Sequence, residues 1–109
     1  MHYSVLLVDN NQDSLHRSAN ALEEQGLNIV TCTNFEDACS LLKEDGSIHV
    51  VLSEWELPQK AKSAKTIKGL DVFKHFLALR YEVSFYIYTN ITDSQQLTSG
   101  GIIAGYFFK

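Results

Sequence analysis

The sequence predicts an α/β protein of three layers, in which a five-stranded parallel sheet carries helices on both faces. Short apolar runs alternate along the chain with segments whose apolar residues recur at helical spacing. Such alternation favours parallel strands joined by right-handed crossovers, and the strand order that fits best is 2-1-3-4-5. Because 109 residues suffice for one hydrophobic core but not for two, we expect a single domain over residues 1–109.

The expected strands are short, apolar and bounded by turn-forming residues. They cover residues 3–8, 27–32, 48–52, 83–88 and 102–108. The first strand is apolar at nearly every position, so we expect it to be buried on both faces.

Two helices are expected before the third strand. The first begins near Asp13 or Ser14 and ends at Gly26. The second begins after Asn34, which can cap it, and Asp37 stands three positions later as in a capping box.

Two further helices are expected in the second half of the chain. One covers the apolar residues between 70 and 77, and a short polar one covers residues 93–99. No sequence follows Lys109 that could form a fifth helix. We therefore expect the sheet face that such a helix would cover to be apolar and to be covered by a partner or by a further segment.

The composition is that of a soluble globular protein, with 45% hydrophobic and 20% charged residues. No apolar stretch approaches the length of a membrane helix, and the N-terminus lacks the pattern of a signal peptide. We therefore expect a cytoplasmic protein, in which Cys32 and Cys39 are free thiols.

The net charge of −4 is unevenly spread, because residues 59–109 hold seven basic and three acidic residues. Four lysines concentrate in one segment, residues 59–68: Lys60, Lys62, Lys65 and Lys68. We interpret this segment as a solvated loop. An acidic partner or a nucleic acid is the alternative, but no aromatic residues lie between the lysines, so direct nucleic-acid binding is not expected.

Polar residues follow two of the expected strands at the point where each strand ends. Asp9 and Asn10 follow the first strand, and Glu54 follows the third. In a sheet of order 2-1-3-4-5, ligands bind beyond the carboxyl ends of strands 1 and 3. We expect these three residues to meet at that edge.

This arrangement resembles the receiver domains of response regulators, which have the flavodoxin-like (CheY-like) fold. The resemblance extends over essentially the whole chain and rests on ordered positions: Asp9, Asn10, Glu54, Pro58, Gly69, Thr89, Tyr106 and Lys109. Asp9 and Asn10 occupy the positions of the paired acids of the family. Glu54 occupies the position of the aspartate that accepts a phosphoryl group.

The resemblance implies a role for each of these residues. The paired acids and the acceptor would hold Mg²⁺ through carboxylate oxygens. Lys109 would pair with the acceptor and its phosphate, and the Thr89 hydroxyl would donate to a phosphoryl oxygen. Tyr106 would be the aromatic residue that changes position when the domain switches.

Two departures from the family pattern weaken this site. Asn10 removes one negative charge from the metal site, and the extra methylene of Glu54 moves its carboxylate by about 1.5 Å. Phosphoryl transfer depends on positioning, so both changes disfavour it. We expect Asp9, Asn10 and Glu54 to bind Mg²⁺ weakly or not at all, and we expect no other cofactor.

The sequence therefore predicts a degenerate receiver that is not an enzyme and is not phosphorylated. Glu54 would then be either a fixed imitation of the phosphorylated state or a solvated relic. The domain would act as a signalling and protein-interaction module in a two-component pathway. Its partners would be proteins, namely a histidine kinase, an output domain or a second copy in a homodimer, and not a membrane.

Two alternatives remain open. The first is an active receiver that a histidine kinase phosphorylates at Glu54. The second is the N-terminal flavodoxin-like wing domain of an ornithine/lysine/arginine decarboxylase, which builds oligomer contacts around a pyridoxal-phosphate enzyme. That wing domain does not require Asp9, Thr89 and Lys109, so their joint presence argues against it.

Overall fold

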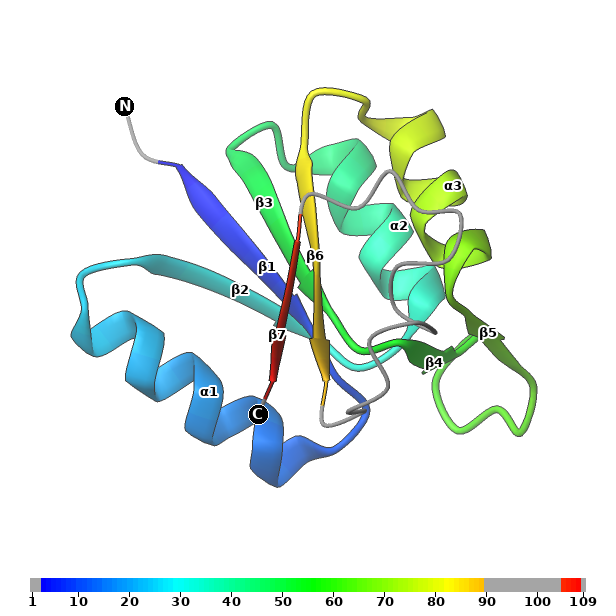
Figure 1. Ribbon diagram of the computed structural model, residues 1–109, viewed down its shortest axis with the longest axis horizontal. Helices are drawn as coiled ribbons and strands as arrows, with labels where there is room; N and C mark the ends of the chain where they lie inside the picture. The colour runs from blue at the N-terminus through cyan, green and yellow to red at the C-terminus, as the bar shows by residue number, and fades with distance from the viewer. Residues whose placement is uncertain (1–2, 90–104, 109) are drawn as a thin grey trace.

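The computed structural model describes residues 3–89 and 105–108, and a twisted parallel sheet runs through its centre (Figure 1). The strands of this sheet are β1 (Ser4–Val8), β2 (Asn28–Cys32), β3 (Ile48–Ser53), β6 (Ser84–Thr89) and β7 (Gly105–Phe108). Their order is β2-β1-β3-β6-β7, and every neighbouring pair is parallel. The predicted order 2-1-3-4-5 is therefore confirmed.

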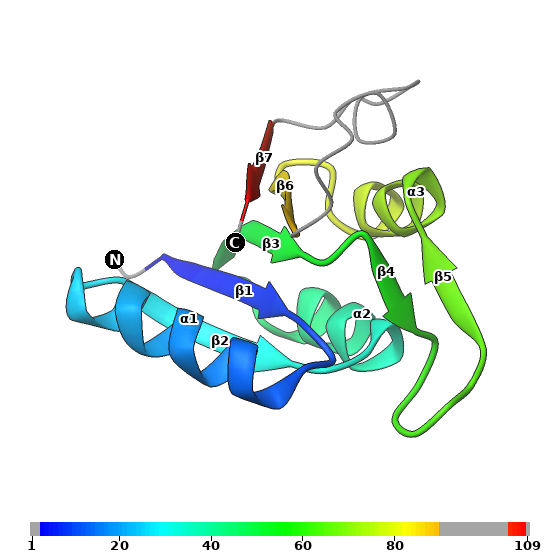
Figure 2. The same ribbon diagram turned by 60° about the horizontal axis from the view of Figure 1, so that its bottom comes forward.

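Helices cover both faces of the sheet (Figures 1 and 2). They are α1 (Gln12–Glu24), α2 (Phe35–Glu44) and α3 (Leu70–Leu79). Alternate residues of a strand point to opposite faces, and β1 separates two groups of side chains accordingly. Leu7 packs in a cluster with residues of α1, whereas Leu6 and Val8 belong to the cluster that includes residues of α2 and α3.

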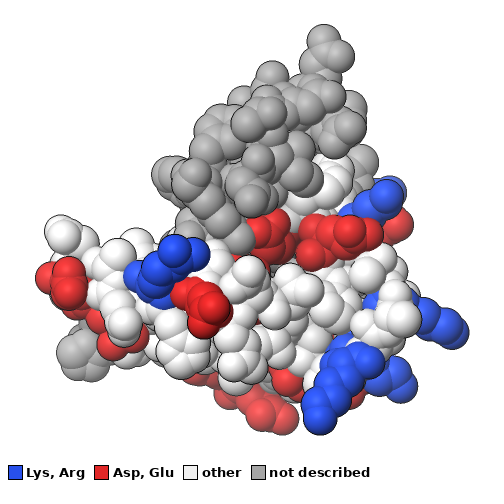
Figure 3. Space-filling model, turned by 90° about the horizontal axis from the view of Figure 1, so that it is seen from below, with Lys and Arg blue, Asp and Glu red and all other residues white. Residues whose placement is uncertain are grey.

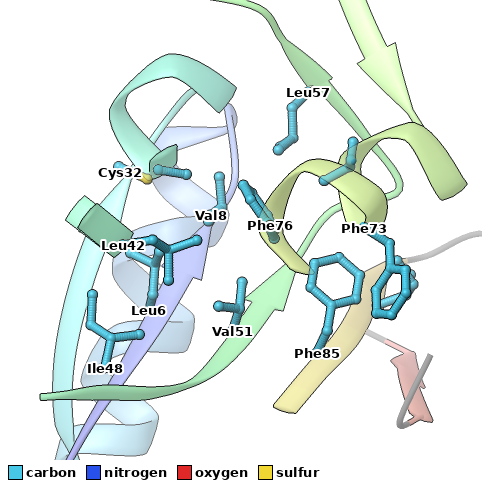
Figure 4. Close-up of a cluster of buried hydrophobic side chains, with 13 residues drawn as sticks. Leu6, Val8, Cys32, Leu42, Ile48, Val51, Leu57, Phe73, Phe76 and Phe85 are labelled. Carbon is cyan, nitrogen blue, oxygen red and sulfur yellow. The ribbon is translucent and has the colours of Figure 1, made fainter. Parts of the chain in front are cut away.

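The larger cluster lies between the sheet and the helices α2 and α3 (Figure 4). Phe73 and Phe76 of α3 contact Phe85 of β6, with ring centroids 5.2 and 5.6 Å apart. Burial of such side chains is the main source of stability for this face, at about 1.5–3 kcal/mol for each large apolar side chain. Strand β1 is buried on both faces, as predicted, because Leu6, Leu7 and Val8 are fully inaccessible to solvent.

Asparagine side chains fix the beginnings of the first two helices. Asn11 caps α1 by accepting the backbone N–H of Ser14 at 3.0 Å, so the helix begins one residue before the expected start. Asn34 caps α2 by accepting the N–H of Asp37 at 2.9 Å, as predicted. The Asp37 carboxylate in turn accepts from the side-chain amide of Asn34, not from its backbone as in the usual capping box.

The segment predicted to be a lysine-rich loop contains part of a hairpin, and the prediction of an irregular loop is wrong in this respect. Strands β4 (Glu56–Pro58) and β5 (Thr66–Lys68) pair in antiparallel fashion and form a separate two-stranded sheet. Strands of three residues show no recognisable periodicity, and Leu57, which is fully buried, anchors this hairpin through tertiary contacts. The four lysines are exposed, as expected.

The sheet face on the α1 side is less completely covered than the opposite face. Leu52 packs with the α1 cluster, and Val50 and Tyr86 share its face by strand alternation; all three are half-buried. On the opposite face, Phe85 and Ile87 are buried. This difference agrees with the expected apolar face, and its covering by a partner or a further segment stays a prediction. The predicted helix over residues 93–99 lies outside the described residues.

Cys32 is buried and Cys39 is half-buried, and both are free thiols, as predicted. Within the described ranges, no helix combines the length and the apolar character that a bilayer crossing requires.

Candidate functional site

The carboxyl ends of β1 and β3 bring the candidate site residues to one edge of the sheet. Val8 and Ser53 are paired in the parallel ladder, and the backbone N–H of Glu54 donates to the carbonyl oxygen of Val8 at 3.1 Å. Asp9 and Glu54 therefore leave adjacent strands at the same level. The structure places them together at the edge where the strand order predicts a ligand site.

Asp9 is a buried acid, with 1% of its surface exposed. Its Oδ1 accepts the backbone N–H of Asn11 at 3.0 Å, and its own N–H donates to the carbonyl oxygen of Cys32 at 3.2 Å. The carboxylate therefore fixes the turn between β1 and α1. Its position just before the N-terminus of a helix is also electrostatically favourable for a negative charge.

Asn10 is exposed and Glu54 is half-buried. The Ser53 hydroxyl, which is fully buried, donates to the carbonyl oxygen of Glu54 at 3.0 Å and holds the backbone at the end of β3. The side chain of Asn10 is a neutral amide. Of the three residues expected to bind a metal, only Asp9 and Glu54 can therefore carry a negative charge.

The Trp55 ring lies against Gly69, at the start of α3. The carbonyl oxygen of Trp55 accepts the backbone N–H of Gly69 at 2.9 Å. Gly69 has a φ of 61°, and a Cβ atom added there would lie 2.9 Å from Cζ2 of Trp55. The glycine at the beginning of α3 is thus required both by its backbone conformation and by the indole ring.

The remaining candidate residues are placed only through the backbone. Thr89 ends β6 and pairs with Phe108, and Tyr106 pairs with Ile87. Thr89 therefore lies at the carboxyl end of the strand next to β3, the position that the resemblance requires of the hydroxyl residue. Lys109 lies outside the described residues. The switch roles of Thr89, Tyr106 and Lys109 stay predictions.

The residues at this edge are a poor donor set for the divalent cation that the receiver resemblance implies. Among the described residues, no group of three or more His, Cys, Asp or Glu side chains could hold a metal ion. One oxygen of Asp9 already accepts a backbone N–H, and Asn10 supplies a neutral oxygen at best. Hard divalent cations are held chiefly by carboxylates, so this donor set favours weak binding.

The two cysteines do not supply a nucleophile. Burial raises the pKa of the Cys32 thiol to about 12, and a hydrogen bond from this thiol to the Asn34 carbonyl oxygen is present at 3.8 Å. Burial also raises the pKa of Cys39, against the opposing effect of Lys43. Both side chains are therefore neutral thiols near pH 7, and the thiolate is the reactive form.

The sequence did not predict the pocket at the tip of the β4–β5 hairpin. The β4–β5 hairpin, which follows Glu54, brings its tip against the turns that follow β1 and β2, and a pocket lies between them. Figure 3 shows this edge of the molecule: acidic side chains lie near its middle, and Lys and Arg side chains gather on the side of the hairpin. The lysine spacing indicated an exposed segment, but nothing in it indicated which turns the segment would face.

No family model matches this sequence, and no curated protein is significantly similar to it. Solved structures do match the fold. A response regulator receiver domain protein from Clostridium thermocellum has a TM-score of 0.81 at 19% identity, over 98% of this chain and 82% of that chain. The chemotaxis response regulator CheY4 of Vibrio cholerae has a TM-score of 0.80 at 16% identity, over 100% and 88% of the two chains.

A third match is the response regulator TrrA from Thermotoga maritima, solved in complex with Mg(2+)-BeF. It has a TM-score of 0.79 at 21% identity, over 98% of this chain and 86% of that chain. At such identities the likeness concerns the fold and not the function of individual residues. The chain described here has the flavodoxin-like, CheY-like fold of the response-regulator receiver domains.

Proposed function

We propose that this domain is a degenerate receiver, a signalling and protein-interaction module of a two-component pathway that does not cycle phosphate. The observation that carries the proposal is the combination at the carboxyl edge of the sheet. A glutamate follows β3 where an aspartate would accept phosphate, and an exposed asparagine follows Asp9 where a second acid would bind the metal. The receiver framework is kept while two components of its chemistry are altered.

The physical reason lies in the steps that phosphoryl transfer requires. A metal ion must neutralise the charge on the phosphoryl oxygens, and the attacking carboxylate must be in line with the bond that breaks. With one carboxylate fewer, the cation is held weakly. With one methylene more, the Glu54 carboxylate is displaced from the position that an aspartate would take.

The domain would then act through its surface. The partners we propose are cytoplasmic proteins: a histidine kinase, an output domain or a second copy of the chain. The structural likenesses reported above favour this function over the decarboxylase wing domain. An active receiver, phosphorylated at Glu54, is the alternative that the following experiment excludes or supports.

Acetyl phosphate is the appropriate phosphodonor, because it requires no cognate kinase. We expect incubation of the protein with acetyl phosphate and Mg²⁺ to leave its intact mass unchanged. The variant Asn10→Asp/Glu54→Asp, which restores both carboxylates in their usual lengths, is the matched control and should gain the mass of one phosphoryl group. A mass gain in the unmodified protein that disappears in Glu54→Gln would show an active receiver and overturn the proposal.

A further inference from the structure

We propose that the pocket at the tip of the β4–β5 hairpin is a binding site for a small molecule that carries a phosphate group. The pocket has a volume of about 540 Å³. Its walls come from the turns after β1 and β2 and from the hairpin: Asn10, Gln12, Thr33, Asn34, Pro58, Ala61, Lys62, Ser63 and Ala64. This volume lies within the range of about 300–1,000 Å³ that small-molecule pockets have.

The charge of the lining favours an anion. Among the described residues that line the pocket, Lys62 is the one that carries a charge, although the chain as a whole has a net charge of −4. The first turn of α2 does contain acids, but Asp37 does not line this pocket, and its carboxylate accepts from the Asn34 amide. A carboxylate at position 10 would face this pocket; the asparagine leaves it without a negative charge.

The polar groups of the lining are suited to donate hydrogen bonds. The Thr33 hydroxyl oxygen accepts the Asn34 amide at 3.4 Å, and the Ser63 hydroxyl oxygen accepts the N–H of Lys65 at 3.1 Å. Because each oxygen already accepts from the protein, its hydrogen can be donated to a ligand. Together with the Lys62 ammonium and the amide of Asn10, these hydroxyls can surround phosphate oxygens with charge-assisted hydrogen bonds.

The hairpin tip is held in place and does not need the ligand to form. The carbonyl oxygen of Gln59 accepts the N–H of Glu36 at 2.9 Å, which ties the hairpin to the start of α2. The N–H of Ser63 donates to the Lys60 carbonyl oxygen at 3.1 Å, closing a turn in which Lys62 has a φ of 62°. A site whose groups are already positioned loses less entropy when a ligand binds.

The test is a titration of the ¹⁵N-labelled chain, followed by NMR at constant ionic strength and without Mg²⁺. The probes are inorganic phosphate and, separately, adenosine 5′-monophosphate. We expect saturable shifts of the backbone amides of Gln12, Thr33 and Ser63 with either probe. Tighter binding of the nucleotide would show an organic phosphate as the ligand; equal binding would show a site for the free phosphate group.

Two variants of the hairpin provide the control. Lys62→Ala should weaken binding at least about tenfold, since it removes a charge-assisted contact. Lys65→Ala removes the same charge from the same hairpin but lies outside the pocket lining, and it should leave the affinity unchanged. Asn10→Asp should also weaken binding, because it places a carboxylate in the lining.

Shifts that do not saturate, or an equal loss of affinity in Lys62→Ala and Lys65→Ala, would show unspecific attraction to exposed lysines and overturn the proposal. This outcome is independent of whether Glu54 accepts phosphate, because the titration contains neither acetyl phosphate nor Mg²⁺. The pocket proposal can therefore fail although the chain takes no phosphoryl group, and it can hold although the chain is an active receiver.

Discussion

At the carboxyl edge of the sheet, Trp55 and Gly69 pack against each other so closely that each restricts the other. Trp55 follows Glu54, and its ring occupies the space that a side chain at position 69 would need. The conformation of Gly69, with φ 61° and ψ −131°, is one that residues with a Cβ atom rarely adopt. The beginning of α3 is therefore coupled to the residue that follows Glu54.

The variant Gly69→Ala tests this coupling. We expect it to lower the free energy of unfolding by about 1–3 kcal/mol, because the added methyl group both strains the backbone and collides with the indole. Urea unfolding followed by circular dichroism measures the change. Gly46→Ala is the matched control, since its Cβ atom would meet nothing within 4 Å, and it should change stability by less than about 0.5 kcal/mol. Equal effects of the two substitutions would contradict the argument.

Trp55 can serve as a probe of Mg²⁺ binding, because it is the only tryptophan of the chain and follows Glu54 directly. We expect a Mg²⁺ titration followed by tryptophan fluorescence to reach half-saturation on the order of millimolar or above, since the site has lost a carboxylate. The variant Asn10→Asp should bind more tightly. Saturation of the unmodified protein at micromolar Mg²⁺ would contradict a degenerate site.

The elements of the fold are joined by one side chain in particular, Arg80 at the end of α3. Its guanidinium donates to the carbonyl oxygens of Leu42 and Asp45 at 3.1 and 3.2 Å, and to that of Ile48 at 2.9 Å. Carbonyl groups at the end of a helix lack partners within the helix. Arg80 satisfies them at the end of α2 and connects both helices to the start of β3.

Loss of this connection should destabilise the domain. We expect Arg80→Ala to lower the free energy of unfolding by about 2–3 kcal/mol, because hydrogen bonds from a charged donor to three carbonyl oxygens are lost. Arg80→Lys should recover only part of the loss, since an ammonium lacks the planar arrangement of donors. Arg17→Ala, at an exposed position on α1, is the control for charge removal and should have little effect in the same urea unfolding experiment.

The molecule as a whole should lose stability in acid through two carboxylates near Arg80, those of Asp45 and Glu82. Hydrogen bonds from Ser47 lower the pKa of Asp45, and the bond from the Ser47 hydroxyl has a larger effect than the bond from the Ser47 backbone N–H. The hydrogen bond from Arg80 lowers the pKa of Glu82. A carboxyl group whose pKa is lower in the folded state contributes stability above its ordinary pKa, and this contribution is lost as the pH falls through the folded value.

We therefore expect the urea midpoint to be constant from pH 7 to about pH 5 and to fall below about pH 4, where these groups take up protons. The double variant Asp45→Asn/Glu82→Gln should show a smaller fall over the same range. An identical pH dependence of the two proteins would show that other carboxylates control the acid response.

Much of the fold follows from local patterns in the chain. The apolar runs determined the strands, because a parallel sheet covered on both faces needs continuous apolar segments such as the first one. Asn34 and Asp37 determined where α2 begins, since an N-cap acts within one turn of its own helix. The order of the strands then followed from the handedness of the crossovers, and with it the meeting of Asp9 and Glu54 at one edge.

Other features depend on contacts between residues far apart in the sequence, and only the tertiary structure decided them. Strands β4 and β5 are too short to show a period, and they exist because Leu57 is buried in the core. The pocket that Lys62 and Asn10 both line and the carbonyl partners of Arg80 likewise depend on segments that meet only when the chain is folded. Local propensity determined which of the main helices and strands form. Long-range packing decided which polar groups lie near each other, because those contacts exist only once distant segments of the chain are folded together.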